Sequence, residues 1–457
     1  MKKILLIGNG AREHVIGETL KRSRHGVELF IVGKTKNPGL SAICEDYLLA
    51  DVCDKNAIKD FALKVKPDFA FIGPENPIEK GIVDMLAEFE IKSASPFQTV
   101  GRLESSKSFT RDLLEKYKIP GNPKFKVFYN EDGLNNFFDQ LGRAKGGQAE
   151  DFVVKADGLK GGKGVMVSGD HLKNKEEGIA YAKECLKEGG RVVVEEKLVG
   201  QEFSLMSFCD GRHAEGMPVV QDHKRAYDGD RGPNTGGMGT YSDSNHSLPF
   251  LNAEDIEQAQ SITQQVAEAL FKETGCYFKG IMYGGFMAVK DGIRLIEYNA
   301  RFGDPEAMNV LPLLKTDFVE ICEAVISGDL KGLGKVEFEN KATVCKYVVP
   351  QGYPDNPVKG EKIEIGDIND AGRAGSGASG VLKTYFASVN QRDDGLYLSG
   401  SRAIAFVGIA DNLEEAERLA ETGVESVKGP VFHRKDIGTA ELIQKKVKMM
   451  QDLRNKA

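Results

Sequence analysis

The alternation of strand-like and helix-like segments near the N-terminus constrains the fold of this chain most strongly. The apolar runs that predict strands are Ile4–Ile7, Leu29–Val32, Tyr47–Ala50 and Phe69–Ile72. Helical patterns at residues 11–22, 55–65 and 78–90 separate these runs. Strands that alternate with helices form a parallel sheet covered on both faces. We therefore predict an α/β protein whose N-terminal domain is a doubly wound parallel sheet.

The length of 457 residues accommodates about three domains. We predict an N-terminal domain at residues 1–104, a central domain at residues 105–330 and a small C-terminal α+β domain at residues 331–457. Within the central domain, residues from about 124 to 200 repeat the strand–helix rhythm as a compact αβ unit. The composition shifts to Gly-, Pro- and Asp-rich connections after Leu330, which suggests the second boundary.

Charge, hydropathy and cysteine usage exclude several classes of protein. The formal net charge of −7 argues against a nucleic-acid binder, which should present a basic face. No apolar run reaches 18 residues, so we expect no membrane association. The seven cysteines are scattered and form no CxxC pair, which argues against a disulfide framework or a zinc site. These features predict a cytoplasmic protein.

The segment KADGLKGGKGVMV (155–167) predicts a phosphate-binding loop. Four glycines and three lysines fall within its first ten residues. Glycine lets the backbone approach a ligand closely, and backbone N–H groups and lysines suit phosphate oxygens. The P-loop pattern GxxxxGK[ST] nevertheless fails, because Asp157 and Gly164 occupy two of its positions. A nucleotide would therefore bind in another way.

The segment LLIGNGAREH places a glycine turn between a strand that ends at Gly8 and a helix that starts near Ala11. Such a helix N-terminus binds anions. Glu13 occupies the third glycine position of GxGxxG, and Lys34 follows the second strand where a dinucleotide site needs an acidic residue, so NAD binding is disfavoured. A phosphorylated sugar helped by Arg12 or His14 fits better. The alternative is a glycine turn without a ligand.

Two glutamates follow strands and suit ribose hydroxyls. Glu75 lies in IGPENP (72–77), after the strand Phe69–Ile72, and Glu202 lies in RVVVEEKLVGQEFS (191–204). Ligands of open α/β sheets bind at the carboxyl ends of strands. The alternatives are that Glu75 caps the next helix and that the acidic residues after VVV belong to a strand end entering solvent.

The segment IRLIEYNARFGDPE (293–306) predicts a metal site. In a strand, Glu297, Asn299 and Arg301 share one face, whereas Ile296 and Tyr298 face the other way into packing. Carboxylate and amide oxygens suit Mg²⁺, and an arginine beside them can hold an acyl phosphate or a carboxylate. The alternative is a surface strand with an exposed polar face.

The segment QDHKRAYDGDRGPNTGGMG (221–239) combines several charges of both signs with a run of glycines. Such a loop suits an amino acid, which is a zwitterion. The alternative is a flexible surface loop. In LESSKSFTRDLL, Lys107 stands in the first turn of a predicted helix and alone indicates little.

Taken in order, these segments resemble the ATP-grasp superfamily and, more narrowly, the glycinamide ribonucleotide synthetases. The pair PNTGGMG and RFGDPE is the most specific part of the resemblance. The matching segments are GNGAREH, GPENP, LESSK, VVKADGLKGGKGV, VVEEKLVGQEFS, QDHKRAYDGDRGPNTGGMG and EYNARFGDPE over residues 8–306, and GSRAIAFVG at 400–408.

The resemblance implies a nucleotide held between two αβ units, with the glycine-rich loop as a mobile flap over the phosphates of ATP. The ATP residues implied are Lys107, Lys155, Gly158, Gly161, Gly162, Lys163, Glu195, Lys197, Leu198 and Glu202. The implied ligands of Mg²⁺ or Mn²⁺ are Glu297 and Asn299. The catalytic residues implied are Lys224, Asp228, Arg301 and Asp304. The other substrate residues implied are Gly8, Asn9, Gly10, Arg12, Glu13, His14 and Glu75 for phosphoribosylamine, and Asn234, Thr235, Gly236 and Gly237 for glycine.

The implied reaction joins glycine to 5-phosphoribosylamine in purine biosynthesis, with glycyl phosphate as intermediate and ADP and phosphate as products. The amine is labile, so we expect transient contact with the preceding enzyme of the pathway. Two departures stand out: Ala11 replaces a family glycine, and the strand YGGFM (283–287) offers no metal ligand, so water must complete the metal shell or Glu297 must bridge two ions.

Three other interpretations remain. Another ATP-grasp ligase or carboxylase of purine synthesis would share the nucleotide residues, but PNTGGMG and RFGDPE argue against it. A non-catalytic nucleotide-binding regulator should lack the metal pair. A dinucleotide oxidoreductase fails at Glu13 and at the second strand.

Overall fold

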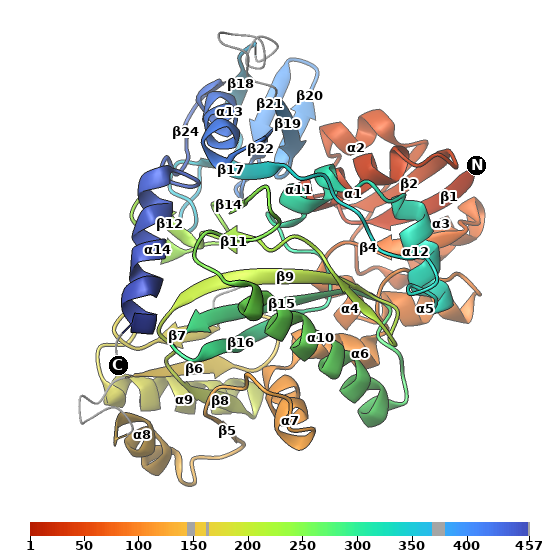
Figure 1. The fold of residues 1–457 in the computed structure, drawn as a ribbon. Helices are drawn as coiled ribbons and strands as arrows, with labels where there is room; N and C mark the ends of the chain where they lie inside the picture. Colours follow the sequence, from red (N-terminus) through yellow and green to blue (C-terminus); the bar gives the residue numbers. More distant parts are fainter. Residues whose placement is uncertain (144–150, 161–163, 368–379, 456–457) are drawn as a thin grey trace.

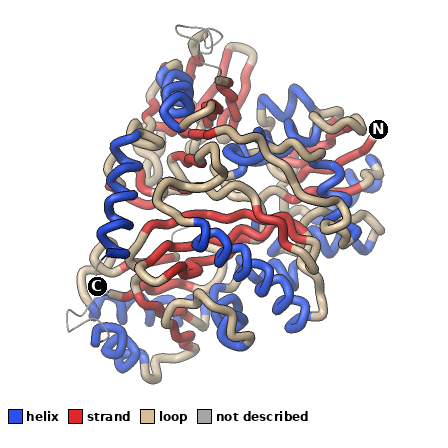
Figure 2. The backbone as a smooth tube through the Cα atoms, viewed as in Figure 1, coloured by secondary structure: helices blue, strands red, loops and turns tan. Residues whose placement is uncertain are grey.

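The computed structural model describes residues 1–143, 151–160, 164–367 and 380–455 (Figure 1). Its strands are gathered into several sheets with helices packed around them (Figure 2). The N-terminus lies in the N-terminal sheet, and the C-terminal helix runs along the opposite side of the molecule (Figure 1). Within the described residues, no helix combines the length and the apolar character that a membrane crossing requires.

The N-terminal sheet is parallel throughout, with the strand order β3-β2-β1-β4. Successive residues of β1 point to opposite faces. Ile4 and Leu6 pack in one apolar cluster with residues of α1, whereas Leu5 and Ile7 pack in another with residues of α3. The strands are β1 (Lys2–Ile7), β2 (Val27–Gly33), β3 (Asp46–Leu49) and β4 (Phe69–Ile72). The predicted doubly wound sheet is therefore confirmed.

The helices of this unit follow the predicted pattern with one difference. They are α1 (Ala11–Lys21), α2 (Pro38–Ile43), α3 (Lys55–Val65), α4 (Glu75–Glu79) and α5 (Ile82–Glu88). The single helix predicted at residues 78–90 is wrong. Gly81, which has a φ of +71°, separates α4 from α5, because a left-handed residue cannot continue a helix.

Two antiparallel αβ units form the centre of the chain. The first has the sheet order β5-β8-β6-β7 and the second β10-β9-β15-β16. The first contains β5 (Phe125–Phe128), α8 (Leu134–Arg143), β6 (Phe152–Ala156), β7 (Val165–Val167), α9 (Lys175–Gly189) and β8 (Val192–Glu196). The second contains β9 (Gln201–Cys209), β10 (Ala214–Gly216), α10 (Ala253–Thr274), β15 (Gly280–Val289) and β16 (Gly292–Asn299). Helices α6 (Gln98–Ser105) and α7 (Lys107–Lys116) precede both units.

The C-terminal sheet includes strands from the central region. Its order is β11-β14-β17-β22-β19, and β24 also pairs with β17. The strands are β11 (Gln221–Asp222), β14 (Gly239–Ser242), β17 (Ala342–Pro350), β19 (Val381–Phe386), β22 (Ile404–Ala410) and β24 (Val431–Phe432). The predicted boundary after residue 330 therefore does not separate two independent sheets, because β11 of the central region pairs with β14, and β14 pairs with β17.

The remaining elements complete this end of the molecule. They are β12 (Arg225–Tyr227), β13 (Arg231–Asn234), α11 (Ala307–Val310), the 3₁₀ helix at Leu311–Leu313, α12 (Phe318–Ser327), β18 (Lys362–Ile365), β20 (Val389–Arg392), β21 (Gly395–Leu398), α13 (Leu413–Glu425), β23 (Val427–Lys428) and α14 (Ala440–Asn455). Helix α14 returns to the second αβ unit, where Arg454 pairs with Asp255 of α10 at 2.7 Å. The C-terminal unit is thus tied to the central unit at both the sheet and the last helix.

Candidate active site

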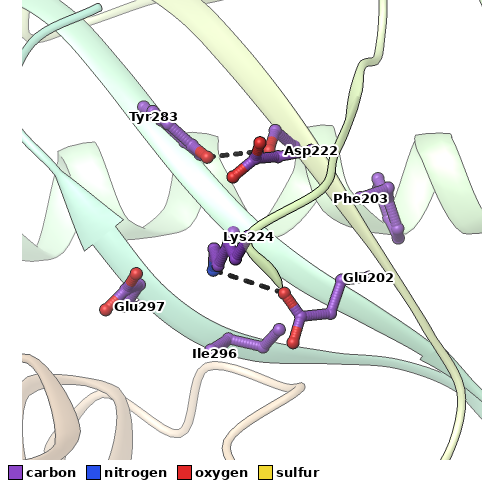
Figure 3. Close-up of a pocket in the computed structure, with 9 residues that line it drawn as sticks. Glu202, Phe203, Asp222, Lys224, Tyr283, Ile296 and Glu297 are labelled. Carbon is purple, nitrogen blue, oxygen red and sulfur yellow. Dashed lines mark hydrogen bonds and ion pairs between the residues drawn. The ribbon is translucent and has the colours of Figure 1, made fainter. Parts of the chain in front are cut away.

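A pocket opens on the central sheet where β9, β15 and β16 meet the segment after β11. Lys224 lies between two carboxylates in this pocket (Figure 3). Its Nζ is 3.3 Å from Oε2 of Glu202, and Glu202 is the leading cause of the raised pKa of Lys224. The lining residues are Glu202, Phe203, Ser204, Asp222, Lys224, Tyr283, Gly285, Ile296 and Glu297. A site of this composition can bind a ligand that carries both charge signs.

A β-bulge in β16 brings Ile296 into this pocket. The register with β15 passes from Gly285 opposite Glu297 to Phe286 opposite Leu295, so Ile296 is the extra residue. Ile296 consequently lines the pocket beside Glu297, whereas Tyr298 is buried and its hydroxyl lies 3.0 Å from Thr263 Oγ1. The prediction that Ile296 faces packing is wrong, because alternation along a strand breaks at a bulge.

The same bulge provides an acceptor for two buried cations. The carbonyl of Ile296 accepts hydrogen bonds from Lys155 Nζ at 2.9 Å and from Arg111 at 2.8 Å. Both cations also pair with Glu195, Lys155 at 2.8 Å and Arg111 at 2.5 Å. Lys155, Arg111 and Glu195 are all at least 95% buried. This network joins the first αβ unit, α7 and the second αβ unit.

Burial and pairing shift the pKa values in this network. Burial lowers the pKa of Lys155 in spite of the nearby Glu195. Burial alone would raise the pKa of Glu195, but Arg111 and Lys155 lower it below its ordinary value. Glu195 is one of the ATP residues that the resemblance implies, and that role stays a prediction. The structure places its carboxylate in a buried ion network with Arg111 and Lys155.

The start of the glycine-rich loop is anchored on α7. Lys107 donates from Nζ to the carbonyl of Gly158 at 2.9 Å. Asp157 accepts from the hydroxyls of Ser106 and Ser108 at 3.1 and 2.7 Å. Gly161, Gly162 and Lys163 lie outside the described residues. The predicted phosphate residues Lys107, Lys155 and Gly158 therefore lie at one junction, between α7 and the first αβ unit.

Two of the implied ATP residues, Lys197 and Leu198, follow β8 in the first αβ unit. Lys197 donates from Nζ to the carbonyl of Ser168 at 2.6 Å, and Leu198 is half-buried. The predicted ribose residue Glu202 is exposed at the start of β9. These residues connect the first unit to the pocket on the second.

Arg301 lies at the centre of a second charged cluster, which joins the central sheet to the N-terminal unit. Its Nε is 3.3 Å from Glu75, and its NH2 group is 2.9 Å from Glu104 and 3.2 Å from Oδ1 of Asn299. Arg12 meets the same cluster, because it and Arg301 both donate to the carbonyl of Phe302 at 3.2 Å.

The two carboxylates around Arg301 differ in their pKa values. Burial would raise the pKa of Glu75, but Arg301 and Arg12 lower it to about 2. Glu104 is more deeply buried, and burial raises its pKa to about 7 even though Arg301 is adjacent. Arg301 thus faces one firmly ionised carboxylate and one that titrates near neutral pH.

The GNGAREH turn is built around the side chain of Glu13. Glu13 accepts from the backbone N–H of Gly10 at 2.6 Å and pairs with Arg12 at 2.6 Å. A Cβ on Gly8 would lie 2.5 Å from Glu13 Cγ, so Gly8, with a φ of +125°, must be glycine. Glu13 therefore caps its own helix where a dinucleotide-binding turn needs glycine. Asn9 lies in the same turn and donates to Thr35 Oγ1 at 2.8 Å.

His14 lies apart from these polar groups. Its Nδ1 accepts from the backbone N–H of Phe386 in the C-terminal unit at 3.1 Å, and its ring packs over Gly39, where a Cβ would come within 1.9 Å. Burial lowers the pKa of His14 to about 4, which keeps the ring neutral at pH 7. The structure thus places His14 between the N-terminal and C-terminal units, and its contact with a sugar stays a prediction.

The PNTGG segment is held close to Lys224. Thr235 donates to the carbonyl of Lys224 from its N–H at 2.7 Å and from its hydroxyl at 2.9 Å. At Gly237, which has a φ of +106°, a Cβ would lie 2.8 Å from Asp222 Oδ1 and 2.6 Å from Pro305. Because residue 237 has no side chain, the PNTGG segment can lie against both Asp222 of the pocket and Pro305 of the RFGDPE turn. Asn234 lies 3.4 Å from His171 in the first αβ unit.

Asp228 lies on the exposed turn between β12 and β13. Its carboxylate accepts from the backbone N–H of Lys435 in the C-terminal unit at 2.9 Å. Among the described residues, it is not part of the lining of the pocket. The segment at residues 221–239 is thus divided in space. Asp222 and Lys224 line the pocket and Gly237 lies against Asp222, whereas Asp228 contacts the C-terminal unit.

Glu297 and Asn299 fit the predicted divalent metal. They lie two residues apart on β16, past the bulge, and offer a carboxylate and an amide oxygen. Burial alone would raise the pKa of Glu297, but Lys224, Lys155 and Lys107 lower it, so the carboxylate is ionised. His25, Asp317 and Glu320 also bring ligand atoms together, but His25 and Arg24 already pair with Glu320.

Several residues of these clusters escape the sequence analysis. Glu104, Asp222, Glu306 and Arg402 stand inside quoted segments, but neither spacing nor charge distinguishes them there. Glu306 accepts from the hydroxyl of Tyr283 at 2.5 Å, and burial together with Glu306 raises the pKa of Asp222. Arg111, one helical turn after Lys107, was also not predicted. Only the fold brings its partner Glu195 near.

Comparisons with known proteins agree with this architecture. The phosphoribosylglycinamide synthetase N domain matches residues 2–104, its ATP-grasp (A) domain residues 105–307 and its C domain residues 343–440. The phosphoribosylamine–glycine ligase of Methanocaldococcus jannaschii is 50% identical over 99% of this chain and 100% of that protein. The Pyrococcus furiosus enzyme of the same name is 47% identical over 99% and 98%. The crystal structure of phosphoribosylamine–glycine ligase from Thermotoga maritima superposes with a TM-score of 0.75 at 29% identity, covering 95% of this chain and 99% of that one.

Replacement of Glu195 by Gln should destabilise the protein by about 3–5 kcal/mol, because it leaves Arg111 and Lys155 buried without a counter-charge. Urea unfolding at pH 7 measures this. The matched control is Glu188→Gln, whose partner Lys160 is exposed, and which should change stability by less than about 0.5 kcal/mol.

The pKa of Glu195 is lowered in the folded state, so the stabilisation that it provides is present above the ordinary carboxyl range and is lost as the pH falls through the folded-state pKa. The difference between wild type and Glu195→Gln should therefore shrink in acid. Equal stabilities at pH 7 would contradict the network.

Proposed function

The chain belongs to the phosphoribosylglycinamide synthetase family, and we propose that it joins glycine to 5-phosphoribosylamine at the expense of ATP, giving glycinamide ribonucleotide, ADP and phosphate. This is an ATP-dependent carbon–nitrogen ligation of purine biosynthesis. The observation that supports it best is the convergence of Lys155, Lys224 and Glu297 on one pocket region, next to the Arg301 cluster. The relatives described above are named for this activity.

The proposed division of labour follows the three predicted domains. Residues 1–104 bind phosphoribosylamine, residues 105–330 form the ATP-grasp domain with a mobile subdomain at about 124–200, and residues 331–457 form the C-terminal domain. The family matches at residues 2–104, 105–307 and 343–440 support the first boundary, and the second proposed boundary falls in the gap between the last two matches.

ATP binds between the two αβ units in this proposal. Lys107 and Lys155 approach its phosphates, and the loop at residues 157–164 covers them. Lys197 and Leu198 border the base, and Glu202 accepts from the ribose hydroxyls. Glu195 acts on ATP indirectly, because its carboxylate pairs with Lys155 Nζ at 2.8 Å and thereby positions this lysine. Glu297 and Asn299 would hold Mg²⁺ or Mn²⁺, which would supply positive charge at the phosphate oxygens.

Glycine binds beside Lys224 and the Asn234–Gly237 segment. Its carboxylate attacks the γ-phosphorus, and ADP leaves. The resulting glycyl phosphate has a leaving group that a free carboxylate lacks. Lys155, Lys224 and Arg301 neutralise the negative charge that the transferred group carries, so catalysis depends on position and electrostatics rather than on a covalent enzyme intermediate.

Phosphoribosylamine binds at the GNGAREH turn, with Arg12 and Glu75 beside it. Its amine then attacks the acyl carbon, and phosphate leaves. The 3.2 Å contacts that Arg12 and Arg301 share with the Phe302 carbonyl support a common site, because they fix the sugar end next to the acyl end. Asp304 follows in the same turn. Flap closure excludes water from the acyl phosphate.

The proposed cellular setting is the cytoplasm, with transient contact to the preceding pathway enzyme and no nucleic-acid or membrane partner. All seven cysteines are free, which suits a reducing compartment. The net charge of −7 supports the absence of a nucleic-acid partner.

ADP release by the wild-type protein should require both glycine and phosphoribosylamine. The assay contains ATP and Mg²⁺, generates the amine in situ, and tests amino acids singly. Omission of either co-substrate should reduce the rate to background, since the amine step completes the turnover. If another amino acid supported release and glycine did not, the substrate assignment would be lost and the ATP-grasp assignment would survive.

Replacement of Glu297 by Ala should lower ATP turnover by more than about a hundredfold at every glycine concentration, since the loss removes a metal ligand rather than a glycine contact. The control is Glu364→Ala, which removes an exposed strand glutamate of the C-terminal unit and should leave the rate unchanged. Normal turnover in Glu297→Ala would reject the metal assignment.

A further inference from the structure

The C-terminal unit reaches the active-site turn at Asp304. Oδ1 of Asp304 accepts from the hydroxyl of Tyr347 at 2.7 Å and pairs with Arg402 at 3.2 Å. Tyr347 lies on β17 and is fully buried, and Arg402 lies just before β22. The side chains of Asp304 and Arg402 are only 17% and 14% exposed. One oxygen of this carboxylate is therefore fixed by residues of the C-terminal sheet.

Arg402 joins Asp304 to the glycine-rich PNTGG segment. Its NH1 group donates to the carbonyls of Gly236 at 2.6 Å, Gly237 at 3.1 Å and Asp304 at 3.0 Å. Its guanidinium lies 4.5 Å from the centre of the Tyr347 ring. A planar guanidinium can satisfy all these partners in one orientation, whereas the single ammonium of lysine cannot. Arg402 thus locks two segments of the proposed glycine site to each other.

The other oxygen of Asp304 faces the N-terminal unit. Oδ2 lies 3.9 Å from the position that a Cβ on Gly10 would occupy. Gly10 belongs to the turn proposed to hold phosphoribosylamine, and Arg12 from that turn reaches the carbonyl of Phe302, two residues before Asp304. The carboxylate therefore stands between the acyl side and the sugar side of the site, with Oδ1 held from the C-terminal unit.

We propose that Arg402 and Tyr347 are positioning residues that aim Oδ2 of Asp304 at the amine of phosphoribosylamine. This inference rests on the proposed function. The amine nitrogen forms a C–N bond with the acyl carbon of glycyl phosphate, and the C–O bond to phosphate breaks with its electron pair leaving on phosphate. The proton that the nitrogen loses passes to Oδ2.

The C-terminal unit supplies this orientation before substrate binds. A carboxylate held by two donors on one oxygen needs little reorganisation when the other oxygen is used. Asp304 without these donors would rotate about its side-chain bonds. The loss in a variant without the Tyr347 hydroxyl should fall on the amine step, because that hydroxyl donates to the Asp304 carboxylate, whereas Arg402 also supports the backbone at Gly236 and Gly237.

The Tyr347→Phe variant tests this directly, since it removes one hydroxyl and keeps the buried ring. We expect kcat/KM for phosphoribosylamine at saturating glycine to fall about tenfold or more, and the KM for glycine to change less than about twofold. The control is Tyr385→Phe, which removes another buried hydroxyl, near Glu18, and should leave both constants unchanged. Thermal unfolding establishes that both variants fold.

The Arg402→Lys variant should lower kcat/KM for both substrates, because it also releases the glycine-site backbone. An unchanged kcat/KM for the amine in Tyr347→Phe, or equal losses for amine and glycine in that variant, would overturn the proposal, as would normal kinetics in Arg402→Lys. If wild-type ADP release did not depend on glycine and the amine, the proposed function itself would fail, which separates the two outcomes.

Discussion

The buried contacts of Lys155 and Arg111 with Glu195 and with the carbonyl of Ile296 are the interaction on which the rest of the site depends. Three fully buried charged groups are tolerable only when each has a partner. The bulge at Ile296 supplies the additional acceptor, since an extra residue in β16 frees a carbonyl from regular pairing. One network therefore fixes the first αβ unit and α7 against the strand that bears Glu297. The positive charge of Lys155 also lowers the pKa of Glu297, which lines the pocket.

The N-terminal and C-terminal units contact the turn that follows the C-terminal end of β16. Past Glu297 and Asn299, Arg301 joins the N-terminal unit through Glu75, and Asp304 joins the C-terminal unit through Tyr347 and Arg402. Ile296, Arg301 and Asp304 thus connect this strand and the turn after it to the first αβ unit, the N-terminal unit and the C-terminal unit. In the proposed function, the site for two co-substrates and a nucleotide is therefore assembled around this one segment, which accounts for its many charged residues.

Much of this organisation could be predicted from the sequence. Alternating runs at Ile4–Ile7 and Phe69–Ile72 predict the doubly wound sheet, because periodicity reports burial on each face. The spacing of two residues also predicts that Glu297 and Asn299 share one face of the strand, because both lie after the bulge, where the side chains alternate regularly.

The orientation of Ile296 was predicted wrongly, because the sequence pattern does not reveal a β-bulge. His14 and Asp228 lie in quoted segments but contact the C-terminal unit, and Arg402 reaches Asp304 from about a hundred residues away. Such contacts depend on how the units dock, which local patterns do not encode.

The central claim is that the energy of ATP reaches the new C–N bond through the carboxylate of glycine. Turnover with glycine labelled with ¹⁸O in both carboxylate oxygens tests it most directly, with the released phosphate analysed by mass spectrometry. Attack of the carboxylate on the γ-phosphorus followed by loss of phosphate must transfer one labelled oxygen to each phosphate. The account predicts this transfer at one label per turnover. Unlabelled phosphate, released at the same rate as the ligation product, would contradict it.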